Sequence, residues 1–343
     1  MTRPHTPRSV ACGVLLVAFV VAATACSPTS TTTPTAPTPP PPQGPALSIS
    51  CPANQTATAT ASSGIAVTFA APTTSGGVAP VQTSCAPQSQ SLFPVGPTTV
   101  RCTATDAAQA TAACSFTVTV APPVPQISRT RFLAFGDSMT AGEVTQPTGV
   151  NARDGAANFK LIIVPAASYP SQLLNRLRAR YTGQVTQLQI TNAGVPGEWA
   201  QDGARRLPGI LANSRPEAVL LLEGVNDVAA LGTRGVQQAT AAIDTMAREV
   251  RNRGGRLFIA TIPPTRGSGL NSVPVGLIQT LNSAIRTTAR GENAVLVDVY
   301  EAISSDVNRF IGSDGLHPTE AGYQRIAETF FNAIRADLEV RIP

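Results

Sequence analysis

The residues that could do chemistry in this chain are one serine and one Asp-x-x-His pair. Ser138 follows directly after an apolar run, within the segment 132–143 (FLAFGDSMTAGE). A serine hydroxyl is a poor nucleophile at neutral pH unless a base lies within hydrogen-bond reach, and histidine is the usual base. The chain has only two histidines, His5 and His317, and Asp314 lies three residues before the second. Because His5 falls in a predicted leader, the spacing favours His317 as the base and Asp314 as the acid that orients it.

Each of these residues also has a purely structural interpretation. Ser138 could cap the following helix, because serine is a preferred N-cap residue. A lone Asp-x-x-His turn is more often part of a surface loop than a catalytic pair. Nucleophilic catalysis also requires hydrogen-bond donors for an oxyanion, and a fold that brings Ser138 and His317 together. The hypothesis therefore depends on the elements that position these residues.

Residues 131–340 show the pattern of a parallel β-sheet covered by helices. Continuous apolar runs alternate with helical segments, and a weaker strand is expected at 185–191. The continuous runs are 131–135, 218–222, 256–262 and 294–299. Such runs are typical of strands buried on both faces of an α/β domain. We expect a doubly wound parallel sheet with the ligand site at the carboxyl ends of its strands, where Ser138 stands.

Four short motifs follow one another along this region, at predicted strand ends or just before the final helix. They are GDS at 136–138, NAGVPGE at 192–198, GVND at 224–227 and DGLH at 314–317. Together they resemble the four blocks of the SGNH (GDSL) hydrolase family, in the family's order and across residues 131–337. The resemblance implies the flavodoxin-like form of the α/β fold and a serine ester hydrolase that uses no cofactor and no metal.

The resemblance also assigns catalytic roles and a substrate class. Ser138 would attack an ester carbonyl and form an acyl intermediate, His317 would be the base, and Asp314 would hold its imidazole. The substrate would be a small-molecule, lipid or glycan ester, as in esterases, lysophospholipases and thioesterases. Two alternatives are a carbohydrate O-deacetylase of the same fold and an inactive adhesion or scaffold protein. The complete set of matched residues argues against the inactive protein.

The same resemblance implies three hydrogen-bond donors for the oxyanion. They would be the backbone N–H groups of Ser138 and Gly197 and the side-chain amide of Asn226. Gly194 is a rival for the second position, since the second motif holds two glycines, but the glycine before the acidic Glu198 fits better. Asn226 could instead be an ordinary turn residue after a strand.

Four other features of this region have open interpretations. Asp137 and Asp227 are expected to be structural and to bond loop amides. Trp199 lines an acyl pocket or packs the helix that starts there. The long connection at 143–170 is a lid that contacts an acyl chain or an ordinary packed insert.

Residues 47–121 show the alternating pattern of an all-β module. In the segment 114–120 (CSFTVTV) apolar residues alternate with serine and threonines, which predicts a sandwich with one face of each sheet in the core. The stretches CPANQT and SCAPQSQSLFPVGPTTVRCTATD resemble the hyalin repeat family, an immunoglobulin-like module usually associated with adhesion or spacing. A glycan ligand, a protein ligand or none at all would be compatible with that resemblance.

The cysteines indicate disulfides in this module. Four of the six lie in this one stretch and none follows them: Cys51, Cys85, Cys102 and Cys114. An even set in an exported protein is typical of two disulfides, and C-x-x-C metal spacing is absent. Of the three pairings that four cysteines allow, we favour Cys51–Cys114 with Cys85–Cys102.

The N-terminal residues predict export. Residues 1–25 contain two arginines and then an apolar core at 11–23, which is too short for a comfortable membrane span. The stretch VAATAC resembles a bacterial lipobox, which implies that Cys26 becomes a lipidated N-terminus; ordinary secretion with a free Cys26 is the alternative. The protein would then be anchored in the cell envelope, in the periplasm or on the outer surface, or else secreted.

The composition of the chain predicts a tether and a linker and argues against a nucleic-acid partner. Residues 26–46 are rich in proline and threonine, which predicts an extended tether, and 122–130 is expected to be a short, stiff linker. Charged residues make up 13% of the 343-residue chain, with a formal charge of +5. Arginines and acids are interspersed without a basic run, so a nucleic-acid partner is not expected.

Overall fold

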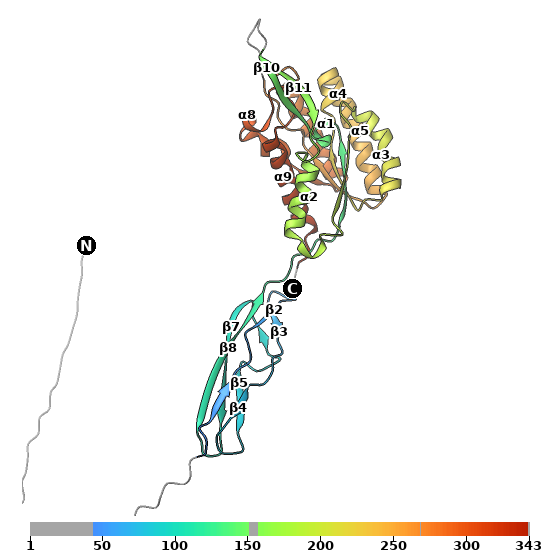
Figure 1. Cartoon of the computed structure of the whole chain (residues 1–343). Helices are drawn as coiled ribbons and strands as arrows, with labels where there is room; N and C mark the ends of the chain where they lie inside the picture. The colour runs from blue at the N-terminus through green and yellow to red at the C-terminus, as the bar shows by residue number, and fades with distance from the viewer. Residues whose placement is uncertain (1–43, 151–156, 268, 342–343) are drawn as a thin grey trace, which may run out of the picture.

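The computed structural model describes residues 44–150, 157–267 and 269–341. The predicted leader, the predicted lipidation residue Cys26 and most of the predicted tether lie outside these ranges. The described chain forms two bodies, each with its own hydrophobic core (Figure 1). No helix in the described ranges is both long enough and apolar enough to cross a membrane.

The first body is all β. Its four-stranded sheet has the order β2-β8-β7-β5, with β2 (Gln55–Thr58), β5 (Gln82–Ala86), β7 (Gly96–Thr105) and β8 (Thr111–Ala121). Two short pairs complete it, β1 (Ser48–Ser50) with β4 (Thr73–Ser75) and β3 (Ile65–Ala66) with β6 (Leu92–Phe93). The β3–β6 pair spans only two residues on each strand, with Ile65 opposite Phe93 and Ala66 opposite Leu92.

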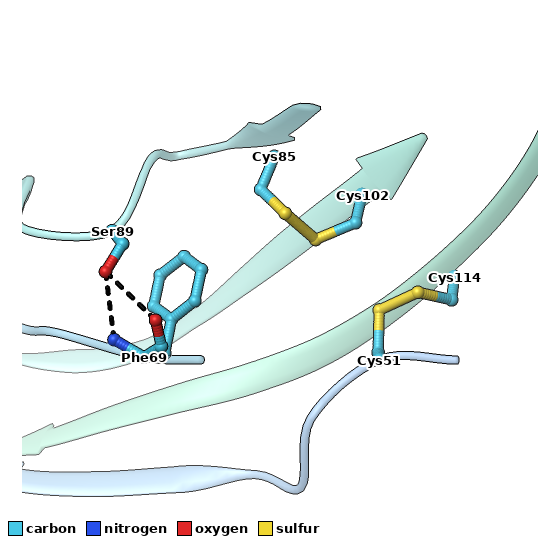
Figure 2. The surroundings of a disulfide bond; sticks show 6 residues. All are labelled: Cys51, Phe69, Cys85, Ser89, Cys102 and Cys114. Carbon is cyan, nitrogen blue, oxygen red and sulfur yellow. Dashed lines mark hydrogen bonds between the residues drawn. A yellow bond between two sulfur atoms is a disulfide. The ribbon is translucent and has the colours of Figure 1, made fainter. Parts of the chain in front are cut away.

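Two disulfides cross-link this body, and both are the favoured pairings (Figure 2). Cys85 and Cys102 are register partners on β5 and β7, with Cα atoms 4.0 Å apart. Cys51 bonds to Cys114 on β8, with Cα atoms 5.7 Å apart. The bonds therefore tie one edge strand and the N-terminal segment to the two long central strands.

The second body is built on a five-stranded parallel sheet. Its order is β12-β9-β13-β14-β15, and the strands are β9 (Arg131–Gly136), β12 (Gln189–Gly194), β13 (Ala218–Leu222), β14 (Arg256–Ala260) and β15 (Val295–Val297). This confirms the predicted doubly wound parallel sheet. The strand expected at 185–191 is displaced to 189–194, because the residues before it form the 3-10 turn η1 (Thr182–Gln184) and its continuation.

Helices cover both faces of this sheet. On one face α2 (Tyr169–Arg180) packs against α9 (Glu320–Leu338), and on the other α5 (Thr233–Asn252) packs between α3 (Ala200–Ser214) and α6 (Val275–Gly291) (Figure 1). The buried side chains of α5 include Val236, Ile243 and Val250.

Shorter elements complete the second body. They are α1 (Ser138–Ala141), β10 (Glu143–Val150), β11 (Ala157–Ile163), α4 (Val225–Leu231), α7 (Val299–Ser304) and α8 (Val307–Phe310). The strands β10 and β11 pair as an antiparallel hairpin that extends from the body beside α1 (Figure 1). The long connection at 143–170 is therefore a hairpin over much of its length.

The predicted linker at 122–130 is partly held by the second body. The backbone O of Gln126 accepts from the N–H of Val340 at 2.8 Å, and Ile127 forms a bridge with Glu339. The backbone N–H of Ile127 also donates to the side chain of Gln184 at 2.8 Å. The segment from Gln126 onward is thus fixed along the end of α9 before β9 begins.

Candidate active site

Ser138 lies where the sequence pattern placed it, at the carboxyl end of β9. The N-cap of α1 is Asp137, whose side chain accepts from the N–H of Met139 at 2.9 Å, so the interpretation of Ser138 as the cap is wrong. Ser138 is instead the first residue of α1 and is 2% exposed. A residue at this position has a backbone N–H without an intrahelical acceptor.

Three predicted catalytic side chains meet at this point. The Oγ of Ser138 lies 2.9 Å from Nε2 of His317, and Nδ1 of His317 lies 2.6 Å from Oδ2 of Asp314. The other carboxylate oxygen of Asp314 accepts the backbone N–H of His317 at 3.1 Å. The structure therefore joins a hydroxyl, an imidazole and a carboxylate in the order that an activated serine requires.

The surroundings of Asp314 favour its ionised form. Burial alone would raise the pKa of this carboxyl, but hydrogen bonds from the His317 ring and the Asn271 amide outweigh burial and lower the pKa below its usual value. The Nδ2 of Asn271 lies 3.1 Å from Oδ2 of Asp314. Asp314 therefore stays charged over the pH range in which a histidine base works.

The carboxylates around His317 have the opposite effect on the imidazole. Burial would lower the pKa of His317, but the hydrogen bond and charge of Asp314, together with the charges of Glu143 and Asp137, raise it above its usual value. These negative charges stabilise the imidazolium that forms when His317 takes the proton of Ser138.

The structure distinguishes the two glycines of the second motif. Gly197 lines the same cavity as Ser138 and has a backbone φ of 74°, in the region that favours glycine. A Cβ on Gly194 would lie 2.1 Å from the backbone N of Ala141, so this glycine lets β12 pack against α1. Of the two glycines, only Gly197 is among the residues that line this cavity.

The side chain of Asn226 lines the cavity from the first turn of α4. Its Nδ2 donates one hydrogen bond, at 2.8 Å, to the backbone O of Glu198. That bond fixes the plane of the amide, and the second N–H of Nδ2 remains available to an oxyanion.

The cavity at this site has a volume of about 410 Å³. Polar and apolar residues share its wall: Ser138, Glu143, Leu161, Gly197, Asn226, Ala229, Leu270, Asn271, Ser272, Leu316 and His317. Leu161 comes from the β10–β11 hairpin, and Leu270 is 88% exposed at the rim. A carbonyl held beside Ser138 would therefore have both apolar and hydrogen-bonding neighbours.

Comparison with known proteins identifies the family. Residues 134–325, more than half of the chain, match the model of the GDSL-like lipase/acylhydrolase family. The chain belongs to this family. Residues 41–120 match the HYR domain, so both family resemblances seen in the sequence are confirmed.

Individual relatives match this GDSL-family chain at low identity. Esterase TesA of Pseudomonas aeruginosa is 25% identical over 163 residues, which is 46% of this chain and 76% of that protein. A multidomain esterase of Ruminococcus flavefaciens is also 25% identical, over 179 residues, and the match spans only 22% of its length.

Solved structures also match this chain at low identity. A lipase/acylhydrolase from Enterococcus faecalis has a TM-score of 0.49 at 23% identity, covering 61% of this chain and 97% of that one. Axe2, an acetylxylan esterase from Geobacillus stearothermophilus, has a TM-score of 0.47 at 19% identity, covering 61% and 95%.

Three buried acids of the GDSL-family domain lie close enough to affect one another's ionisation, and the first is next to Ser138 in the chain: Asp137, Glu223 and Asp227. Asp137 and Asp227 accept the backbone N–H groups of Met139 and Ala200, each at 2.9 Å, as expected for structural acids. Burial raises the pKa of Asp137 to about 7, and burial raises the pKa of Glu223 well above its usual value. Asp137 is therefore held with a substantial protonated fraction at neutral pH.

Sequence reasoning missed two residues of the site. Glu143 and Asn271 both line the cavity, and both contact a predicted catalytic residue. Glu143 lies only five residues after Ser138, and Asn271 lies in the loop after a predicted strand, so proximity and strand-end position were available signals. Trp199, by contrast, is the N-cap of α3 and is not among the residues that line this cavity.

Proposed function

We propose that this protein is a serine ester hydrolase that cleaves carboxylic esters through an acyl-Ser138 intermediate. One observation carries the proposal, namely the continuous hydrogen-bonded chain from Ser138 through His317 to Asp314. Membership of the GDSL-like lipase/acylhydrolase family and the presence of two esterases among the relatives support the same chemistry.

The reaction begins with attack on the ester carbonyl. His317 takes the hydroxyl proton as Ser138 Oγ bonds to the carbonyl carbon, and the carbonyl π electrons move to oxygen. The resulting oxyanion accepts hydrogen bonds from the N–H groups of Ser138 and Gly197 and from the amide of Asn226. Asp314 keeps the imidazolium oriented and stabilises its charge.

The second half of the reaction releases two products. His317 Nε2 gives its proton to the alcohol oxygen as the bond from that oxygen to the acyl carbon breaks, which leaves the acyl group on Ser138. Water then attacks the acyl carbon while His317 takes one of its protons. Collapse of the second oxyanion releases the carboxylic acid and returns the proton to Ser138.

Labelling and turnover by the full chain test this proposal. A fluorophosphonate should modify Ser138, and p-nitrophenyl acetate should be hydrolysed with a kcat that falls at least about 10⁴-fold in Ser138→Ala, because the nucleophile is lost. Ser214→Ala, which changes an exposed serine on α3, is the matched control and should keep both properties. Turnover that survives in Ser138→Ala, or a label on another residue, would contradict the proposal.

A further inference from the structure

Apart from the effect of its charge on His317, Glu143 has no role in the reaction as described above, yet its side chain contacts the centre of the site. Its Oε2 lies 3.3 Å from Nε2 of His317, the same nitrogen that contacts Ser138 at 2.9 Å. The side chain is 15% exposed and forms part of the cavity wall. A carboxylate in this position must meet whatever approaches that nitrogen.

The backbone around Glu143 fixes this arrangement. Gly142, with a φ of 95°, ends α1 in the left-handed conformation and turns the chain into β10. The backbone O of Glu143 then accepts a hydrogen bond from the hydroxyl of Tyr323 at 2.6 Å. Within the described residues the Glu143 carboxylate forms no hydrogen bond or ion pair besides its contact with His317, so its oxygens are free to accept from a ligand.

The mechanism determines which part of a substrate lies beside Glu143. The imidazole protonates the leaving oxygen, so this oxygen must come within about 3 Å of Nε2 of His317. In the proposed mechanism the carbonyl oxygen binds elsewhere in the cavity, at Gly197 and Asn226, which both line it. Atoms one or two bonds beyond the leaving oxygen therefore lie within reach of the carboxylate of Glu143, and these atoms belong to the alcohol.

The residues that line the cavity indicate which kind of alcohol group it could bind. An ionised carboxylate accepts charge-assisted hydrogen bonds from hydroxyl groups and repels a phosphate. None of the residues that line the described cavity is a lysine or arginine that could offset a phosphate charge. None is a tryptophan, tyrosine or phenylalanine, the residues that a quaternary ammonium site would favour. A hydroxyl on the carbon next to the ester fits this wall best.

We propose that Glu143 selects the alcohol of the substrate, favouring uncharged polyhydroxy alcohols such as sugars or glycerol over phosphate-bearing ones. This inference rests on the proposed ester hydrolysis and names its substrate class. It favours acylated carbohydrates or glycerides as substrates and disfavours lysophospholipids, whose glycerol leaving group carries a phosphate close to the ester.

Three acetates that differ only in the alcohol provide the test. They are glycerol 1-acetate, n-propyl acetate and 1-acetylglycerol 3-phosphate, assayed with the full chain. We expect kcat/KM for glycerol acetate to exceed that for propyl acetate by about 10-fold, because a hydrogen bond to a charged group adds to transition-state binding. In Glu143→Leu this ratio should fall to about 1.

The charge is tested separately from the hydrogen bond. Glu143→Gln keeps an acceptor oxygen and removes the charge, so kcat/KM for the phosphorylated acetate relative to propyl acetate should rise by about 10-fold. Glu249→Gln, which removes an acid on α5 outside the cavity wall, is the matched control and should leave all the ratios unchanged.

The outcomes separate this inference from the proposed function. Both Glu143 variants must still react with a fluorophosphonate at Ser138, which shows that they are folded and activated. If wild-type protein hydrolyses p-nitrophenyl acetate but the alcohol ratios are the same in wild type and variants, the role of Glu143 is overturned and ester hydrolysis stands. If wild-type protein hydrolyses no ester at all, the proposed function fails first.

Discussion

The two bodies of this chain hold their structure in different ways. The β-sandwich of residues 44–121 has a core of eight buried side chains: Ala59, Val67, Phe93, Val100, Cys102, Phe116, Val118 and Val120. The α/β body has a far larger core on both faces of its sheet and contains no cysteine. A body that buries little apolar surface gains from covalent cross-links, whereas a larger core is stable without them.

The same contrast extends to buried charge. The sandwich buries Asp106, and both its carboxylate oxygens accept backbone N–H groups, from Val78 at 2.9 Å and Ala110 at 2.8 Å. In the α/β body Asp137, Glu223 and Asp227 each have one side-chain oxygen without a hydrogen-bond partner among the described residues. A buried acid that lacks a hydrogen bond lowers the stability of the fold. The α/β body, with its large core, contains three such acids near the site, whereas the buried acid of the sandwich is fully hydrogen-bonded.

The largest expected effect on stability comes from removing the long disulfide. In Cys51→Ala/Cys114→Ala the sandwich should lose about 4 kcal/mol of unfolding free energy, since the bond closes a loop with a sequence separation of 63. Calorimetry of the full chain should show the sandwich transition move to lower temperature while the α/β transition stays in place. Hydrolysis of p-nitrophenyl acetate at 25 °C should be unaffected. A similar fall in the transition temperature of the α/β body, or a fall in turnover, would contradict the conclusion that only the sandwich depends on this disulfide.

The next largest effect is on the rate of hydrolysis, and the stability of both bodies should be unchanged. Asn226→Ala removes one proposed oxyanion donor, so kcat for p-nitrophenyl acetate should fall about 10²–10³-fold, equivalent to about 3 kcal/mol. Asn308→Ala, which truncates an exposed side chain on α8, is the control and should retain full turnover. A kcat for Asn226→Ala within about threefold of wild type would remove Asn226 from the proposed oxyanion site.

Sequence predicted the sheet best where the pattern was local and continuous. The buried runs at 131–135 and 218–222 correspond to β9 and β13, because a strand covered on both faces must be apolar throughout. The strand β12 reads QITNAG and has little apolar pattern of its own. Its position is set by pairing with β9, from Gln189 opposite Arg131 to Gly194 opposite Gly136, and such pairing is not written in local sequence.

The site was predictable to the extent that its residues lie in recognisable motifs. Ser138, Asp314 and His317 stand in such motifs, and the structure brings them together. Glu143 reaches His317 only because the chain turns at Gly142, and Asn271 reaches Asp314 only because two distant loops pack against each other. These contacts depend on tertiary packing, for which one sequence offers no period or spacing.

The smallest expected effect concerns the partly bonded acids and sharpens the contrast between the bodies. Burial raises the pKa of Asp137 from 3.8 to about 7, although the Met139 N–H and the charge of His317 oppose the shift and Glu198 and Asp227 add to it. Between these two values the unfolded chain has lost this proton and the folded chain keeps it. The contribution of Asp137 to the unfolding free energy therefore falls as pH rises from about 4 to about 7, and is level above that.

Asp137→Asn removes this titration and keeps an oxygen that can accept from Met139. The unfolding free energy of the α/β body, taken as variant minus wild type, should be about 2 kcal/mol higher at pH 8 than at pH 5. The effect is smaller than the full pKa shift implies, because local relaxation offsets part of the cost of burying the charge.

Asp106→Asn is the control in the sandwich. Backbone hydrogen bonds, from Val78 foremost, lower the pKa of Asp106, so this acid is ionised in folded and unfolded chains alike across that range. Its substitution should therefore change the sandwich by the same amount at both pH values. Denaturant unfolding of the two full-length variants at pH 5 and pH 8 measures both quantities. If the unfolding free energy of Asp137→Asn relative to wild type is no higher at pH 8 than at pH 5, Asp137 is ionised in the folded protein. The contrast in buried acids between the two bodies then disappears.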